Sequence, residues 1–134
     1  MPLVVPNDGE DLALKALLNN TAGQDQTLKL FSNNITPSET DVAATYTEVT
    51  GGGYASKSLT GANWTFTPGA PSSAQYNATQ TFTFTGAIGG SGTVFGYFVV
   101  QTGTGKLLWA EAKSSFTPAV NGDNIAMTPA ITAD

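Results

Sequence analysis

The densest apolar run of the chain is Val94–Val100, which is interrupted only by Gly96. A strand with one face in water alternates apolar and polar residues, whereas a continuous run indicates cover on both faces. Residues 93–102 are therefore predicted to form a strand that is buried on both sides. The glycines of residues 103–105 predict a turn, and residues 106–113 predict a second strand that completes a β-hairpin. We expect this hairpin at the centre of the fold, with Gly96 at a close packing point or a bulge.

Shorter alternating segments predict further strands around this hairpin. Residues 74–85 alternate most clearly, so that Phe82 and Phe84 face inward and threonines face outward. Trp64 and Phe66 share one face of another predicted strand. The predicted strands besides the hairpin and residues 74–85 cover residues 27–32, 45–49, 54–59, 63–67, 116–120 and 124–131.

One α-helix is predicted near the start of the chain, over residues 12–18. Asp8 can cap its first turn, and Glu10 and Asp11 complement the positive end of the helix dipole. The helix has one apolar stripe, which consists of Leu14, Leu17 and Leu18.

An apolar arm precedes this helix. Leu3-Val4-Val5 lies between Pro2 and Pro6, and proline favours an extended conformation of the residue before it. The arm is either an edge strand of the domain itself or an extension that reaches a neighbouring subunit.

Turn signals complete the prediction of the fold. Thr36-Pro37-Ser38-Glu39 matches a capping box and predicts one turn of α- or 3₁₀-helix. Asn121-Gly122 is a favoured pair for a type I′ turn. Short strands with frequent turns predict an all-β protein, namely an antiparallel β-sandwich (jelly-roll-like) of about eight strands with one short N-terminal α-helix. Jelly-roll and immunoglobulin-like connectivities both remain open. Residues 1–134 fit a single domain, in which residues 1–6 form the extended arm.

The composition bears on the kind of partner. Charged residues make up 11% of the chain, against about 25% in typical domains, so its surface is built largely from neutral polar residues. Such a surface suits packing against other proteins, and it also suits a simple threonine-rich sandwich. The net charge is −5, with five scattered lysines. Nucleic acids and anionic membranes are bound through clustered positive charge, so we predict neither as a partner.

The residue types present leave little catalytic chemistry. The chain has no histidine, cysteine or arginine, which excludes histidine-based nucleophile pairs, the common zinc ligand sets and bidentate arginine clamps. Most carboxylates lie in predicted caps and turns, and only Glu48 and Glu111 lie on predicted strands. We therefore predict that the protein is not an enzyme and has no catalytic residue, cofactor or metal.

A carbohydrate-binding module is the alternative class. Such modules stack sugars on exposed aromatic rings, and Trp64, Trp109 or the four tyrosines could provide them. Each tryptophan also shares its alternation phase with an apolar neighbour, which favours a place in the core.

Several segments together resemble a known family. Leu28–Glu39, Tyr54–Leu59, Phe95–Val100 and Leu107–Glu111 are similar to segments of small virion proteins from tailed bacteriophages. The resemblance covers nearly the whole chain and consists of packing and turn residues. It implies a capsid decoration or cement protein, which binds outside the shell of the major capsid protein and often forms trimers.

This resemblance sets the expected partners and location. The expected partners are the major capsid protein and further copies of the chain, with a trimer favoured. We see no signal peptide and expect synthesis in the host cytoplasm, followed by assembly onto the capsid surface of the virion. The candidate partner contacts are the apolar residues of the arm and of the helix stripe, Leu3, Val4, Val5, Leu14, Leu17 and Leu18.

Overall fold

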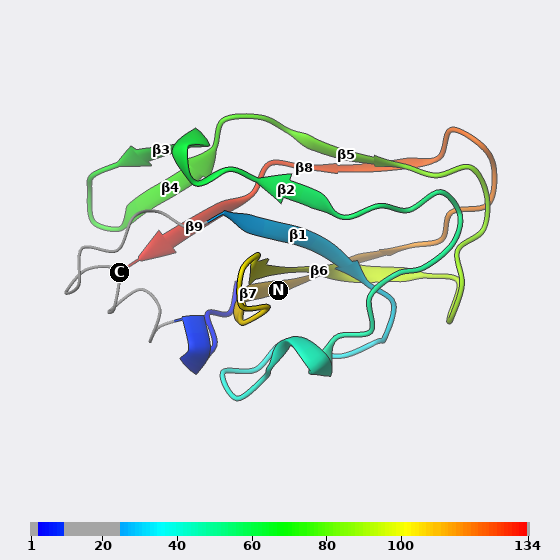
Figure 1. Ribbon diagram of the computed structural model, residues 1–134, viewed down its shortest axis with the longest axis horizontal. Helices are drawn as coiled ribbons and strands as arrows, with labels where there is room; N and C mark the ends of the chain where they lie inside the picture. Colours follow the sequence, from blue (N-terminus) through cyan, green and yellow to red (C-terminus); the bar gives the residue numbers. More distant parts are fainter. Residues whose placement is uncertain (1–2, 10–24, 134) are drawn as a thin grey trace.

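In the computed structural model, which describes residues 3–9 and 25–133, nine β-strands form two antiparallel layers (Figure 1). The strands are β1 (Gln26–Phe31), β2 (Lys57–Leu59), β3 (Trp64–Thr67), β4 (Ser72–Tyr76), β5 (Gln80–Thr83), β6 (Val94–Gln101), β7 (Leu107–Phe116), β8 (Asn124–Met127) and β9 (Ala130–Ala133). Two 3₁₀ turns, η1 (Ala43–Thr45) and η2 (Gly61–Asn63), lie between strands. The predicted fold class, an all-β antiparallel sandwich, is confirmed.

The first layer is one sheet and the second layer consists of two sheets in line. The first has the strand order β2-β1-β6-β7. The second contains β3-β4-β9 and β5-β8. Since β4 leads into β5 and β8 leads into β9, the two sheets follow each other along the length of the molecule (Figure 1). A hydrogen bond from the Tyr76 N–H to the Pro129 carbonyl, 2.9 Å long, continues the pairing beyond β4 and β9.

The main core lies between the two layers. Alternate residues of the paired strands point into it, because successive side chains of a strand face opposite sides. From the first layer it includes Leu28, Leu30, Leu59, Tyr97, Val99 and Trp109, and from the second layer Tyr76, Phe82 and Phe84. The inward direction predicted for Phe82 and Phe84 is confirmed.

A second apolar cluster covers the opposite side of β6. Phe98 and Val100 of β6 pack there with Phe31 of β1, and the segment after β1 closes over them. Tyr46 of that segment stacks on Phe98, with ring centroids 5.2 Å apart. Every residue of β6 except Phe95 is buried. The prediction of a central strand covered on both faces is therefore confirmed.

Gly96 accounts for the close approach of β6 to its neighbours. A β-carbon at this position would lie 2.6 Å from Cζ of Phe31 and would collide with the Glu111 carbonyl oxygen. The register between β6 and β7 also shifts between Val94 and Gly96. Both features predicted for Gly96, the close packing point and the bulge, are present.

Three predicted elements differ from the structure. Residues 74–85 do not form one strand, because β4 and β5 pair in different sheets and residues 77–79 link them. Residues 117–120 form no strand, and the turn at Asn121-Gly122 carries the chain from β7 in the first layer to β8 in the second, so it closes no hairpin. Residues 45–49 contribute only an isolated bridge between Phe31 and Glu48.

The predicted helical turn also lies at another place. The 3₁₀ turn η1 begins at Ala43, where the Thr45 hydroxyl accepts a hydrogen bond from the N–H of the capping residue Val42 (3.2 Å). The Asp41 carboxylate accepts a hydrogen bond from the Ser38 N–H (2.9 Å), and the Asp41 N–H donates to the Ser38 carbonyl (3.1 Å). These two hydrogen bonds hold a turn over residues 38–41, to which the predicted capping box of residues 36–39 does not contribute.

Candidate binding surface

Trp109 lies in the sandwich interior, and Trp64 is partly buried against it. Trp109 of β7 is 6% exposed, and Trp64 of β3 packs on it edge to face, with ring centroids 5.8 Å apart. Nε1 of Trp64 donates a hydrogen bond to the Gln26 side-chain oxygen, 2.9 Å away. Trp109 is thus buried in the core, as the alternation pattern predicted.

The carboxylates of Glu48 and Glu111 each join a tyrosine to a lysine. Glu111 accepts hydrogen bonds from the Tyr97 hydroxyl and from Nζ of Lys113, both at 2.8 Å. Glu48 accepts from Nζ of Lys29 at 2.8 Å and from the Tyr54 hydroxyl at 3.1 Å. These contacts occupy the carboxylates, which explains the two clusters as structural links between neighbouring strands and loops.

The tyrosines of these clusters stay protonated at neutral pH. Burial is the largest cause that raises the pKa of Tyr97 and of Tyr54, and the neighbouring carboxylate raises each pKa further. A neutral phenol that donates to a carboxylate stabilises the fold but is a poor general base.

Within residues 3–9 and 25–133, no three metal-binding side chains of histidine, cysteine, aspartate or glutamate gather at one place. In the same part of the chain, no helix has the length and apolar character needed to cross a membrane.

Charge is divided unevenly between the two layers. The strand residues that carry charge, Lys29, Lys57, Glu111 and Lys113, all lie in the first layer. The five strands of the second layer contain no charged residue. Their outward side chains are Thr65 and Thr67 of β3, Ser73 and Gln75 of β4, Thr81 and Thr83 of β5, Asn124 and Ala126 of β8, and Ala130 and Thr132 of β9. We call this surface the neutral face.

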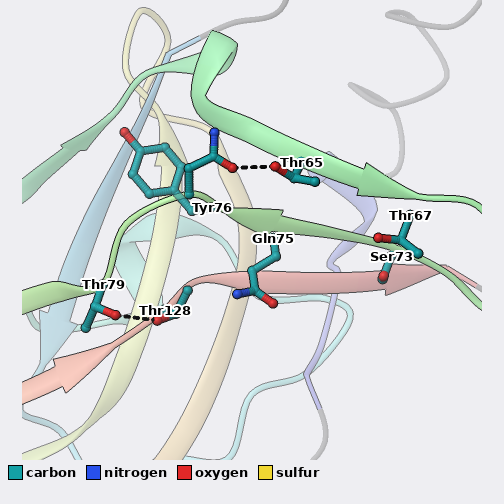
Figure 2. Close-up of a pocket in the computed structure, with 8 residues that line it drawn as sticks. Thr65, Thr67, Ser73, Gln75, Tyr76, Thr79 and Thr128 are labelled. Atoms are coloured by element: carbon teal, nitrogen blue, oxygen red, sulfur yellow. Dashed lines mark hydrogen bonds between the residues drawn. The ribbon is translucent and has the colours of Figure 1, made fainter.

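A groove of about 420 Å³ is set into the neutral face near the break between β4 and β5 (Figure 2). Hydroxyl and amide groups line it, and two hydrogen bonds fix part of its wall. The Thr65 hydroxyl donates to the Asn77 side-chain oxygen, and the Thr79 and Thr128 hydroxyls lie 2.8 Å apart. In the described structure, the side chains of Thr67, Ser73 and Gln75 make no hydrogen bond, so the groove offers polar groups to a ligand or partner.

The predicted arm contacts lie against the domain itself. Val4 pairs with Ala110 of β7 through two hydrogen bonds, of 3.1 and 3.0 Å, and Leu3 and Val5 pack against the main core. The pairing matches the edge-strand alternative, and a contact of these residues with a partner stays a prediction. Residues 7–9 are helical. The predicted helix over residues 12–18, with Leu14, Leu17 and Leu18, lies outside the described residues.

Phe66 is a surface residue that the alternation pattern missed. It lies on the same side of β3 as Trp64, as the alternation predicted, yet it is 74% exposed. The sequence signal for this exposure is the position of Phe66 one residue before the end of the strand and two before Pro68-Gly69, beyond the cover of the opposite layer.

Comparison with known proteins found no match: the chain matches no protein-family model, no curated protein and no solved structure.

Proposed function

We propose that this protein is a capsid decoration protein of a tailed bacteriophage, which binds the outside of the assembled major capsid protein shell and stabilises it. The observation that carries the proposal is the neutral face, an entire layer of the sandwich without a charged side chain in its strands. The resemblance of the chain to small virion proteins supports the same role.

The absence of charge matters because docking removes surface groups from water. A buried charge without a partner is strongly destabilising, whereas a hydroxyl or amide can exchange its water for a hydrogen bond to the partner. Threonine alone would be weak support, since it has a high β-propensity on any exposed sheet. The contrast with the first layer, whose outward side carries the Lys29–Glu48 ion pair, is what favours the second layer as the docking surface.

The mechanism of stabilisation would be mass action. A protein that binds the assembled shell and not its dissociated parts lowers the free energy of the shell by RT ln(1 + [L]/Kd) for each site. Because a capsid repeats the same site many times, a modest affinity per copy is sufficient. The buried, two-sided core around β6 makes the protein a rigid part for such a lattice.

The direct test is to mix the purified protein with undecorated shells of the same phage. We expect the protein to co-sediment with the shells, to reach a saturating ratio and to raise the temperature at which the shells rupture. If the folded protein stays in the supernatant and the rupture temperature is unchanged, the decoration role is refuted.

The groove supports a second candidate function, the binding of an uncharged saccharide. Its free groups, among them the Gln75 amide and the Ser73 hydroxyl, are the donors and acceptors that recognise sugar hydroxyls. This site differs from the expected one, because it relies on hydrogen bonds rather than on stacking against tryptophan.

Saccharide binding can be measured by NMR titration with neutral oligosaccharides. If the groove binds them, Gln75→Ala should weaken binding at least about tenfold, as expected when polar ligand groups lose a partner. Thr83→Ala, on the neutral face but outside the groove, should leave binding unchanged. Shifts that avoid the groove, or no shifts at all, would exclude this candidate.

A further inference from the structure

β3 is an edge strand without the usual protection of an edge. In the described structure it pairs only with β4, since its sheet has the order β3-β4-β9. Its four residues, Trp64–Thr67, include no charge and no proline, and its register with β4 is regular. Natural proteins commonly protect edge strands with lysine, proline or bulges, because an open edge can pair with another strand.

An apolar hollow of about 200 Å³ lies beside this edge. Its lining consists of Trp64, Phe66, Ala74, Trp109 and Ile131, together with Gln26 and Gly61. The walls are held in place by packing, because Trp64 contacts both Trp109 and Tyr76 edge to face. Engineered apolar cavities of about 150 Å³ accept benzene, so a hollow of this size can accept a phenyl ring.

We propose that two copies of this chain associate through their β3 edges and exchange Phe66 side chains. Two β3 strands can pair antiparallel around a twofold axis at Thr65. That register places Phe66 of one copy opposite Trp64 of the other, on the same side of the sheet. The three-stranded sheets then join into one six-stranded sheet, β9-β4-β3-β3-β4-β9.

The features of the β3 edge themselves indicate that its partner is a second copy of the chain. Phe66 lies on β3 and the hollow lies beside the same strand, and a surface that carries both a ring and a hollow can be complementary to a second copy of itself. A twofold contact of this kind uses each feature twice and closes without forming a fibre. No charged residue of β3 would be buried, since β3 has none. The contact is independent of the decoration role, because it uses the edge of the second layer and leaves its neutral face open.

The test is sedimentation velocity of the full chain over a wide range of concentrations. We expect a reversible monomer–dimer equilibrium. Phe66→Ser should weaken the dimer about 100-fold, from about tenfold for each of the two exchanged rings. Val120→Ser is the matched control, because Val120 is also an exposed apolar residue (62%) but lies in the loop between β7 and β8, and it should leave the dimer unchanged.

A second pair of variants tests the strand register. Thr65→Lys places two like charges opposite each other across the twofold axis, which should also dissociate the dimer. Thr81→Lys adds the same charge to β5 and should have no effect. Circular dichroism checks that each variant is folded. A wild-type chain that is monomeric at every concentration overturns the proposal, as does association that survives both Phe66→Ser and Thr65→Lys.

Discussion

Phe98→Ala is expected to lower the free energy of unfolding by about 3–5 kcal/mol, the usual range for removing a buried phenylalanine side chain. Phe98 is 3% exposed and packs under Tyr46 on the outer side of the first layer. Its neighbour Val99 is fully buried on the other side, in the main core. Val99→Ala should therefore also be destabilising, by about 2 kcal/mol for two lost carbon groups and the cavity they leave.

The two substitutions together test whether β6 is covered on both faces. Denaturant unfolding followed by tryptophan fluorescence measures both free energies, and Val120→Ala, at an exposed loop position, should change stability by no more than about 0.5 kcal/mol. A near-neutral result for Phe98→Ala would show that the segment after β1 does not seal the second cluster. The domain would then have one core instead of two.

Ser73→Lys combined with Thr83→Lys is expected to weaken binding to capsid shells at least about 100-fold. Ser73 lies on β4 and Thr83 on β5, so the two lysines place charge at both ends of the neutral face. If this face docks on the shell, each ammonium group is buried without a partner, and an uncompensated buried charge costs about 3–5 kcal/mol. The measurement is the concentration dependence of co-sedimentation with undecorated shells.

Two controls separate docking from unspecific effects of charge. Ser58→Lys with Ser114→Lys adds the same charge to exposed positions of β2 and β7 in the first layer, and binding should be retained. Glutamate in place of lysine at Ser73 and Thr83 should weaken binding as well, because the cost comes from burial rather than from the sign of the charge. Equal effects from both layers would assign the loss to general electrostatics and not to the neutral face.

The central part of the fold was predictable from local pattern. The apolar run around Gly96 required cover on both faces, and the structure provides it from two separate clusters. The break in residues 74–85 was not predictable in this way, because the alternation of side chains continues through Phe82 and Phe84 while the pairing partner changes from β9 to β8. Periodicity reports which side a residue faces and carries no information on the strand with which it pairs.

The candidate surfaces could be identified only after the strands had been assigned to the two layers. No single segment reveals the neutral face, since it appears only when β3, β4, β5, β8 and β9 are known to share one layer. Phe66 shows a similar limit. Its shared face with Trp64 was predicted correctly, but burial also requires a facing strand, and none of the described strands covers the end of β3. The arm is a third case, because the sequence left open whether Val4 would join its own domain as an edge strand or reach a neighbouring subunit. In the structure it pairs with Ala110 of its own domain.

The most direct test of the decoration role is a cryo-EM reconstruction of shells incubated with the protein. The neutral face should lie against the major capsid protein, with the outer side of the first layer turned toward the solvent. Density in which the first layer contacts the shell and the strands β3, β4, β5, β8 and β9 face outward would contradict the role assigned to the neutral face. Shells without additional density would contradict decoration itself.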